Sequence, residues 1–277
     1  MLLSSKYHAH AHALKEAQRT GKTLSAPSRT LGLTPEVSHE ILETLHKLNV
    51  AEGLHTVGRR VIADGLHSAV NDAPRARLGY LYSERLLADE DDADLTISIG
   101  RHKHVCLEPK FALHLSEPLE GKSGWEEFVS SIVGISHAWE VLAIPYGKDD
   151  WTYDDRVCAN GFSRELIVGT SKTLTDKSKQ NFNELLSHAT FSFSKIQGAA
   201  SQITGFTTGP QTMLSSIYDA YLLYQQQCDS ESTSCAAPGG MLALNSLCKP
   251  IRVSAGEEWS FVSTGFGLKT LQIKILK

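Results

Sequence analysis

The chain has 277 residues, of which 41% are hydrophobic and 21% are charged, and its 27 Lys and Arg against 31 Asp and Glu give a formal net charge of −4. This composition excludes disordered, collagen-like and coiled-coil proteins. A pI of about 6.3 without a basic stripe argues against nucleic acid as a partner. No apolar run reaches the roughly 18 residues of a membrane helix, so we expect no membrane partner.

The first quarter of the chain has a helical pattern. Residues 5–19 are rich in Ala, Leu, Lys and Glu and contain no proline, and Gly21 follows as a stop signal. A second helix is predicted from the cap Thr34, with Pro35 in its first turn, to a point before Gly53. We therefore expect a helical region over residues 1–57, followed by one β-rich unit over 58–277.

Short β-prone stretches separated by Gly, Pro, Asp and Ser fill the rest of the chain. Strands are predicted at Leu95–Ile99, Val105–Leu115, Glu140–Ile144, Glu165–Val168, Thr190–Ile196, Met241–Leu244, Ile251–Val253, Trp259–Ser263 and Leu271–Leu276, with helical inserts at Gly124–Val133 and Thr212–Gln227. Many short strands and few helices predict an α+β fold dominated by a barrel or sandwich.

The cysteines indicate a reducing compartment. There are five of them, and they form no C-x-x-C pair. The first residues lack the basic stretch and apolar core of a signal peptide. We expect reduced thiols and a cytoplasmic location, with Cys228 and Cys235 able to pair only if oxidised.

Four groups of motifs follow one another over most of the chain. They are LSAP at 24–27 with HTVGRRV at 55–61, LEPKFAL at 107–113, AWEV at 138–141 with DRVCANG at 155–161, and PGGMLALNSL at 238–247. Their order and spacing resemble the hydratase/decarboxylase branch of the fumarylacetoacetate hydrolase superfamily. The resemblance implies a twisted β-barrel with an N-terminal helical region. It also implies oligomeric assembly, which for this chain means a homo-oligomer.

The resemblance further implies a site in which carboxylates hold Mg²⁺ or Mn²⁺ and the metal binds a 2-oxo or enol acid. Such ions prefer carboxylate oxygens and stabilise an enolate. Glu108 and Glu140 match the family's carboxylates, but Lys110 replaces the second acid of its E-x-E pair, and Arg60 replaces its strand lysine. The metal site is therefore not intact, and no metal cofactor is expected. If a metal is bound, Glu108 and Glu140 are its ligands.

The replacement of the family's second acid by Lys110 has a physical interpretation. Residues 108 and 110 of a strand point to the same face, so the Lys110 ammonium is predicted beside Glu108 and near Glu140, where the relatives hold their metal ion. On this hypothesis Lys110, Glu108 and Glu140 are catalytic. The alternative is that Lys110 only neutralises two remaining carboxylates.

Three further residues are candidates for substrate binding. Arg60 is suited to a bidentate contact with an acidic group, although a surface arginine at a strand end would look the same. Asn160 matches the family's D-N and either binds a carboxylate or caps a turn. Trp151 either lines an apolar pocket or packs in the core.

These observations support a leading hypothesis, a lyase, isomerase or cyclase that acts without a divalent metal on a small 2-oxo or enol compound. One alternative is a metal-dependent 2-oxo acid hydratase or decarboxylase with Mg²⁺ or Mn²⁺. The other is a non-catalytic binding protein of the same fold.

Overall fold

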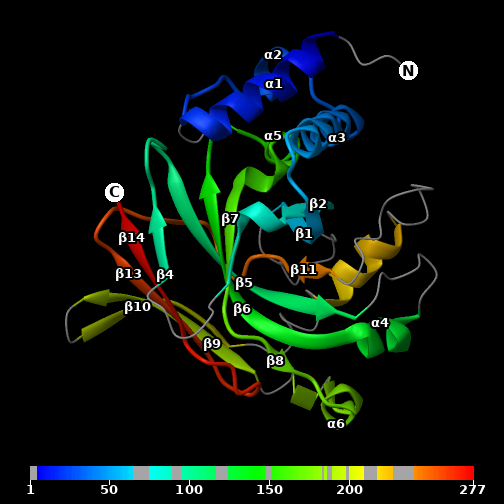
Figure 1. The fold of residues 1–277 in the computed structure, drawn as a ribbon, viewed down its shortest axis with the longest axis vertical. Helices are drawn as coiled ribbons and strands as arrows, with labels where there is room; N and C mark the ends of the chain where they lie inside the picture. The colour runs from blue at the N-terminus through cyan, green and yellow to red at the C-terminus, as the bar shows by residue number, and fades with distance from the viewer. Residues whose placement is uncertain are drawn as a thin grey trace.

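A computed structural model describes residues 5–64, 75–88, 95–116, 124–147, 151–182, 184–185, 189–197, 200–208, 217–226 and 240–277. Helices α1 (Ser5–Thr20), α2 (Pro27–Thr30) and α3 (Pro35–Ala51) come first and lie together at one end of the molecule (Figure 1). The start of α3 is as predicted, because the Thr34 side chain accepts a hydrogen bond from the Val37 backbone and Pro35 occupies the first turn.

The remaining chain alternates strands with short helices. The strands are β1 (Thr56–Ala63), β2 (Ala76–Tyr82), β3 (Leu86–Ala88), β4 (Leu95–Ser98), β5 (Val105–Leu115), β6 (Ile132–Ala143), β7 (Ser163–Val168), β8 (Lys172–Thr173), β9 (Thr190–Gln197), β10 (Ala200–Thr208), β11 (Met241–Ala243), β12 (Ile251–Arg252), β13 (Glu258–Ser263) and β14 (Leu271–Leu276). The helices are α4 (Trp125–Ser131), α5 (Tyr153–Cys158) and α6 (Asp176–Gln180), with single turns η1 (Ser83–Arg85) and η2 (Asn160–Phe162). Residues 217–226 are also helical.

The strands form two sheets. The larger has the order β2-β1-β11-β5-β6-β7-β3, with β12 paired to β5 and β8 paired to β6, and the smaller has the order β10-β9-β13-β14-β4. The long strands β5 and β6 curl through the centre of the molecule, and the smaller sheet packs beside them (Figure 1).

Alternate residues of β5 face two different environments. Leu107, Phe111 and Leu113 enter the main hydrophobic core, where the Phe111 ring meets Phe191 and Phe261 of the smaller sheet edge-on at 5.6 and 5.5 Å. The residues between them, Glu108, Lys110 and Ala112, therefore face the opposite side of the larger sheet. This alternation is what separates the hydrophobic core from the charged residues of β5.

The predicted elements require some corrections. β6 begins at Ile132, eight residues before the predicted Glu140, since α4 ends at Ser131 and the apolar residues after it continue as a buried strand. β2, β3, β8 and β10 were not predicted, and β1 was expected only through the resemblance of its segment to a family strand. The predicted helix Thr212–Gln227 is seen over 217–226, and its ends lie outside the described residues, as do Cys228, Cys235 and Gly239. Within the described part, no helix has the length and apolar character required to cross a membrane.

A buried histidine lies between the two sheets. His137 Nδ1 lies 3.1 Å from the Lys269 carbonyl oxygen and must donate to it, so Nε2 of the neutral ring accepts the Ser263 hydroxyl at 2.7 Å. Burial lowers the pKa of His137 to about 4. The ring is therefore a neutral part of the core at pH 7.

This pKa predicts a pH dependence of stability. Because the unfolded chain protonates His137 near pH 6.5 and the folded chain only near pH 4, the free energy of unfolding should fall as the pH is lowered from 6.5 to 4, by about 1.4 kcal/mol per unit of pKa shift. Urea unfolding at several pH values measures this. His137→Asn should reduce the slope in that window without removing it, because burial also lowers the pKa of His46 to about 4, and a slope unchanged by the substitution would contradict the prediction.

Candidate active site

The antiparallel register of β5 and β6 builds the centre of the site. Glu108 pairs with Glu140, and Lys110 pairs with Ala138, so two carboxylates face each other with an ammonium one row along. Glu108, Lys110 and Glu140 are all completely buried. The small side chains of Ala112, Ala138 and Ala243 form the next part of the same face. The two strands thus bring three charged side chains together in the protein interior.

Lys110 lies between the two carboxylates. Its Nζ atom is 2.7 Å from Glu140 Oε2 and 3.4 Å from Glu108 Oε2. On the other side of Glu140, the Arg60 guanidinium reaches both carboxylate oxygens, with Nη1 and Nη2 each 2.5 Å from one of them. Glu140 is therefore held by two cations at once.

Two glycines provide the space for Arg60, which is also completely buried. Gly79 lies opposite Arg60 on β2, and a Cβ there would come within 2.4 Å of Asn160 Oδ1 and 3.2 Å of Arg60 Cγ. Gly161 has a φ of 69°, and a Cβ there would come within 2.7 Å of Arg60 Nη2. A larger residue at Gly161 would collide with the guanidinium itself, and one at Gly79 would collide with the Asn160 side chain beside it.

Asn160 supports the same arginine through its backbone. Its carbonyl oxygen accepts from Arg60 Nη1 at 3.0 Å, while its side chain bonds the backbone N–H and C=O of Tyr80. Asn160 and Phe162 both have positive φ angles, of 52° and 66°, which costs backbone energy in residues other than glycine. Asn160 therefore positions Arg60, and none of these contacts indicates that it binds a substrate.

Arg156 is a fifth member of this cluster, and our sequence analysis missed it. Its Nη2 atom lies 2.7 Å from Glu108 Oε1, and the residue is 9% exposed. Arg156 comes from α5, where Thr152 and Asp155 form a capping box and Asp155 also bonds the backbone and hydroxyl of Ser28. The one available signal was its place next to the family-like motif at 155–161, because nothing local indicates that this arginine turns toward β5.

We call Arg60, Glu108, Lys110, Glu140 and Arg156 the charged cluster. Burial and the neighbouring charges have opposite effects on the pKa values of its side chains. Burial lowers the pKa of Lys110, while Glu140 and Glu108 counteract part of that effect. For Glu140, Arg60 and Lys110 outweigh the effect of burial, so its pKa lies below the ordinary value. Glu140 is therefore ionised, and Lys110 releases its proton more readily than an exposed lysine.

The charged cluster does not fit a divalent metal ion. Its carboxylates Glu108 and Glu140 already face three cationic side chains, and within the described part of the chain no three His, Cys, Asp or Glu residues come together as a metal-binding group. With Lys110 protonated the cluster has a formal charge of +1, so a divalent ion would sit beside like charges. We derive no step through a metal.

The cluster also retains unused hydrogen-bonding capacity. Among the described residues, five of its buried atoms have no hydrogen-bond partner: Arg60 Nε, Glu108 Oε2, Lys110 Nζ, Glu140 Oε1 and Arg156 Nε. Some of them are at ion-pair distance from an opposite charge but lie off the direction of a hydrogen bond. Unsatisfied buried atoms are rare in proteins and often occur at functional sites.

Trp151 is separate from these residues. Its ring packs edge-on against Phe162 at 4.9 Å and belongs to the hydrophobic cluster under the N-terminal helices. The structure therefore brings Arg60, Glu108, Lys110 and Glu140 together, with Asn160 alongside, and places Trp151 in a packing role. The catalytic and binding roles of the predicted residues stay predictions.

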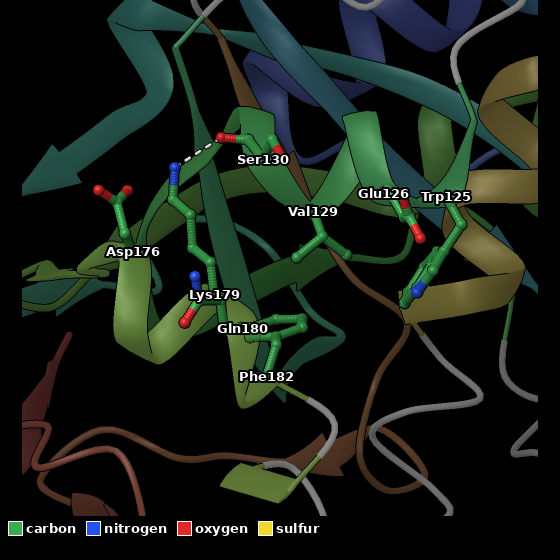
Figure 2. A pocket seen from close by; sticks show the side chains of 8 residues that line it. All are labelled: Trp125, Glu126, Val129, Ser130, Asp176, Lys179, Gln180 and Phe182. Atoms are coloured by element: carbon green, nitrogen blue, oxygen red, sulfur yellow. Dashed lines mark hydrogen bonds between the residues drawn. The ribbon is translucent and has the colours of Figure 1, made fainter.

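Two cavities lie outside the charged cluster. One, of about 590 Å³, lies between α4 and α6, and none of its lining residues belongs to the cluster. In it Glu126 and Asp176 stand on opposite sides, and Lys179 donates to the Ser130 carbonyl at 2.5 Å (Figure 2). The other, of about 400 Å³, lies beneath α1 and includes Ser163, which contacts Glu140. Of these two cavities, the second lies nearer to the candidate active site.

Solved structures show which fold this is. A 4-oxalocrotonate decarboxylase from Pseudomonas putida G7, complexed with magnesium and adipate, superposes over 100% of this chain and 99% of its own, with a TM-score of 0.78 and 16% sequence identity. A yeast protein of the fumarylacetoacetate hydrolase family matches 79% of this chain and 93% of its own, with a TM-score of 0.54 and 14% identity.

A further match is a 2-hydroxyhepta-2,4-diene-1,7-dioate isomerase from Mycobacterium marinum, which matches 80% of this chain and 77% of its own, with a TM-score of 0.52 and 13% identity. No family model and no curated protein sequence matches the chain. The chain has the fold of the fumarylacetoacetate hydrolase superfamily, and the α+β architecture with N-terminal helices expected from the sequence is confirmed. The 4-oxalocrotonate decarboxylase shares that architecture over 99% of its own length.

Proposed function

We propose that this chain is an enzyme that moves a proton next to the carbonyl of a small 2-oxo or enol acid, with Lys110 in place of a divalent metal ion. The observation that carries the proposal is the buried Lys110 ammonium between Glu108 and Glu140. Two proteins that share the fold are named for reactions of 4-oxalocrotonate and of a hydroxydienedioate, which supports this substrate class.

Each residue has a defined task in this proposal. Glu108, whose Oε2 has no hydrogen-bond partner in the described part of the chain, takes a proton from the carbon beside the carbonyl. The electron pair of that C–H bond moves to the carbonyl oxygen, and Lys110 stabilises the resulting enolate by its charge or by giving up a proton. Glu140 and Arg60 hold Lys110 in place, and Arg156 orients Glu108.

Deuterium exchange tests this without knowledge of the complete reaction. The natural protein should catalyse exchange of the C3 protons of a 2-oxo acid such as 2-oxoadipate in D₂O, followed by proton NMR, in the presence of excess EDTA. Lys110→Met should reduce the rate at least about a hundredfold, since general acid–base groups contribute on the order of 10²–10⁴. Lys172→Met, which removes an exposed lysine on β8, is the matched control.

The other outcomes favour the other hypotheses. Exchange that EDTA abolishes would identify a metal-dependent hydratase or decarboxylase with Mg²⁺ or Mn²⁺. Exchange with none of a panel of 2-oxo and enol acids would favour a non-catalytic binding protein. The complete burial of Glu108, Lys110 and Glu140 is the observation that favours this second candidate.

A further inference from the structure

Helix α1, which lies at the helical end of the molecule (Figure 1), carries three histidines within the sequence HAHAHA at 8–13. Residues two apart on a helix point to different faces, whereas residues four apart lie on one face, about one turn from each other. His8 and His12 therefore share a face of α1 that His10 does not. Both are exposed, while His10 is partly buried.

The opposite face of α1 holds the helix in place. Ala11 and Leu14 are completely buried, and they belong to the same hydrophobic cluster as Ile41 and Leu45 of α3. The backbone of α1 is thus packed against the protein over the turn that carries the two exposed histidines. Their spacing is set by the fold, so an ion that binds both of them does not have to order the helix.

The two exposed imidazoles have no other task within the described part of the chain. There, neither His8 nor His12 makes a hydrogen bond, an ion pair or a ring contact. His10 differs, because its Nε2 atom lies 3.3 Å from the Tyr146 hydroxyl oxygen. The ring nitrogens of His8 and His12 are therefore available to a ligand.

Two histidines at this spacing have a defined chemistry. Their Cβ atoms lie about 5–6 Å apart on a helix, which allows both imidazoles to reach one ion at a metal–nitrogen distance of about 2.0–2.1 Å. Helical zinc sites use the same spacing of two histidines. Imidazole nitrogen suits Zn²⁺, Cu²⁺ and Ni²⁺, whereas Mg²⁺ and Ca²⁺ require several oxygen ligands.

The charged neighbours of His12 are already paired. Glu16, one turn further along α1, accepts from Arg19 at 2.7 and 3.0 Å, and Lys15 lies 2.9 Å from Glu52. In the described ranges, no third His, Cys, Asp or Glu joins the two histidines to form a group of three. The protein therefore supplies two ligands, and water or another small donor completes the coordination.

We propose that His8 and His12 form a two-histidine site for a divalent transition-metal ion, Zn²⁺, Ni²⁺ or Cu²⁺, on the exposed face of α1. The site is independent of the proposed function, because no member of the charged cluster belongs to α1. Mn²⁺ binds nitrogen sites more weakly than these ions do, so the site should not contribute to a Mn²⁺ titration of the charged cluster.

Calorimetric titration with Zn²⁺ tests the proposal. The natural protein should bind one Zn²⁺ at this site at least about tenfold more tightly than His8→Asn or His12→Asn does, because two linked ligands bind far more tightly than one. His10→Asn, which alters the histidine on the other face of the same helix, should change the affinity less than twofold. No Zn²⁺ binding by the natural protein, or equal affinity in His8→Asn and His12→Asn, would overturn the proposal.

Electron paramagnetic resonance of the Cu²⁺-loaded protein identifies the ligands directly. The natural protein should show hyperfine coupling to two imidazole nitrogens, and His8→Asn and His12→Asn should each show coupling to one. Identical spectra of the natural protein and of both variants would place the ion elsewhere and refute the proposal.

This proposal and the proposed function fail separately. Lys110→Met should keep the Zn²⁺ affinity of the natural protein, and a loss of that affinity in Lys110→Met would count against a site on α1. His8→Asn should keep the rate of deuterium exchange in excess EDTA. Zn²⁺ binding that depends on both histidines, in a protein that catalyses no exchange, would refute the proposed function alone.

Discussion

Lys110→Glu is expected to create a divalent metal site and to abolish deuterium exchange. The substitution changes the charged cluster from three cations against two carboxylates to two cations against three carboxylates, so its formal charge goes from +1 to −1. Carboxylate oxygens also replace an ammonium that cannot bind a metal. Calorimetric titration with Mn²⁺ should show affinity at least roughly a hundredfold higher than that of the natural protein.

The control for charge alone is Lys172→Glu, which makes the same change at an exposed position of β8. It should leave both the Mn²⁺ affinity and the exchange rate as they are in the natural protein. Tight Mn²⁺ binding by the natural protein would contradict our interpretation of the cluster and would support the metal-dependent alternative.

Glu140→Gln and Lys110→Met are expected to have very different effects on stability. Glu140 is the shared partner of Arg60 and Lys110, so its neutralisation leaves two buried cations uncompensated and should lower the free energy of unfolding by about 3–5 kcal/mol. Lys110→Met leaves Arg60 and Arg156 with Glu108 and Glu140, a neutral set in which Met fills a similar volume. It should cost no more than about 1 kcal/mol.

Urea unfolding monitored by circular dichroism measures both differences. The comparison separates a functional lysine from a structural counterion, because a counterion would be as costly to remove as the carboxylate that it neutralises. A loss for Lys110→Met equal to that for Glu140→Gln would therefore mean that Lys110 holds the fold together, and the proposed function would lose its main support.

Much of the centre of the site follows from local rules that operate along one strand. Two-residue alternation is enough to place Glu108 and Lys110 on one face of β5. The order of the motifs then correctly indicated the fold, and the predicted bounds of β5 and β14 match the structure. β2 and β10 were missed, since no regular apolar alternation distinguishes them from loops.

Other features depend on contacts between segments far apart in the chain. Arg156 reaches Glu108 because the hydrogen bonds of Asp155 to Thr152 and Ser28 hold α5 in place. A count of the charges made without Arg156 underestimates the positive charge of the cluster. Likewise, the need for glycine at positions 79 and 161 is visible only once the Asn160 side chain lies against the first and the Arg60 guanidinium against the second.

The sequence by itself determined the class of fold and the presence of Lys110 where the family has a carboxylate. The order of the motifs and the alternation of side chains along a strand can both be read from neighbouring residues. Only the tertiary structure decided that Arg156 joins the charged cluster, that Trp151 packs against Phe162, and that Arg85 and Gln18 line one cavity. Burial and ion pairing depend on which distant segments fold against one another, and no local pattern carries that information.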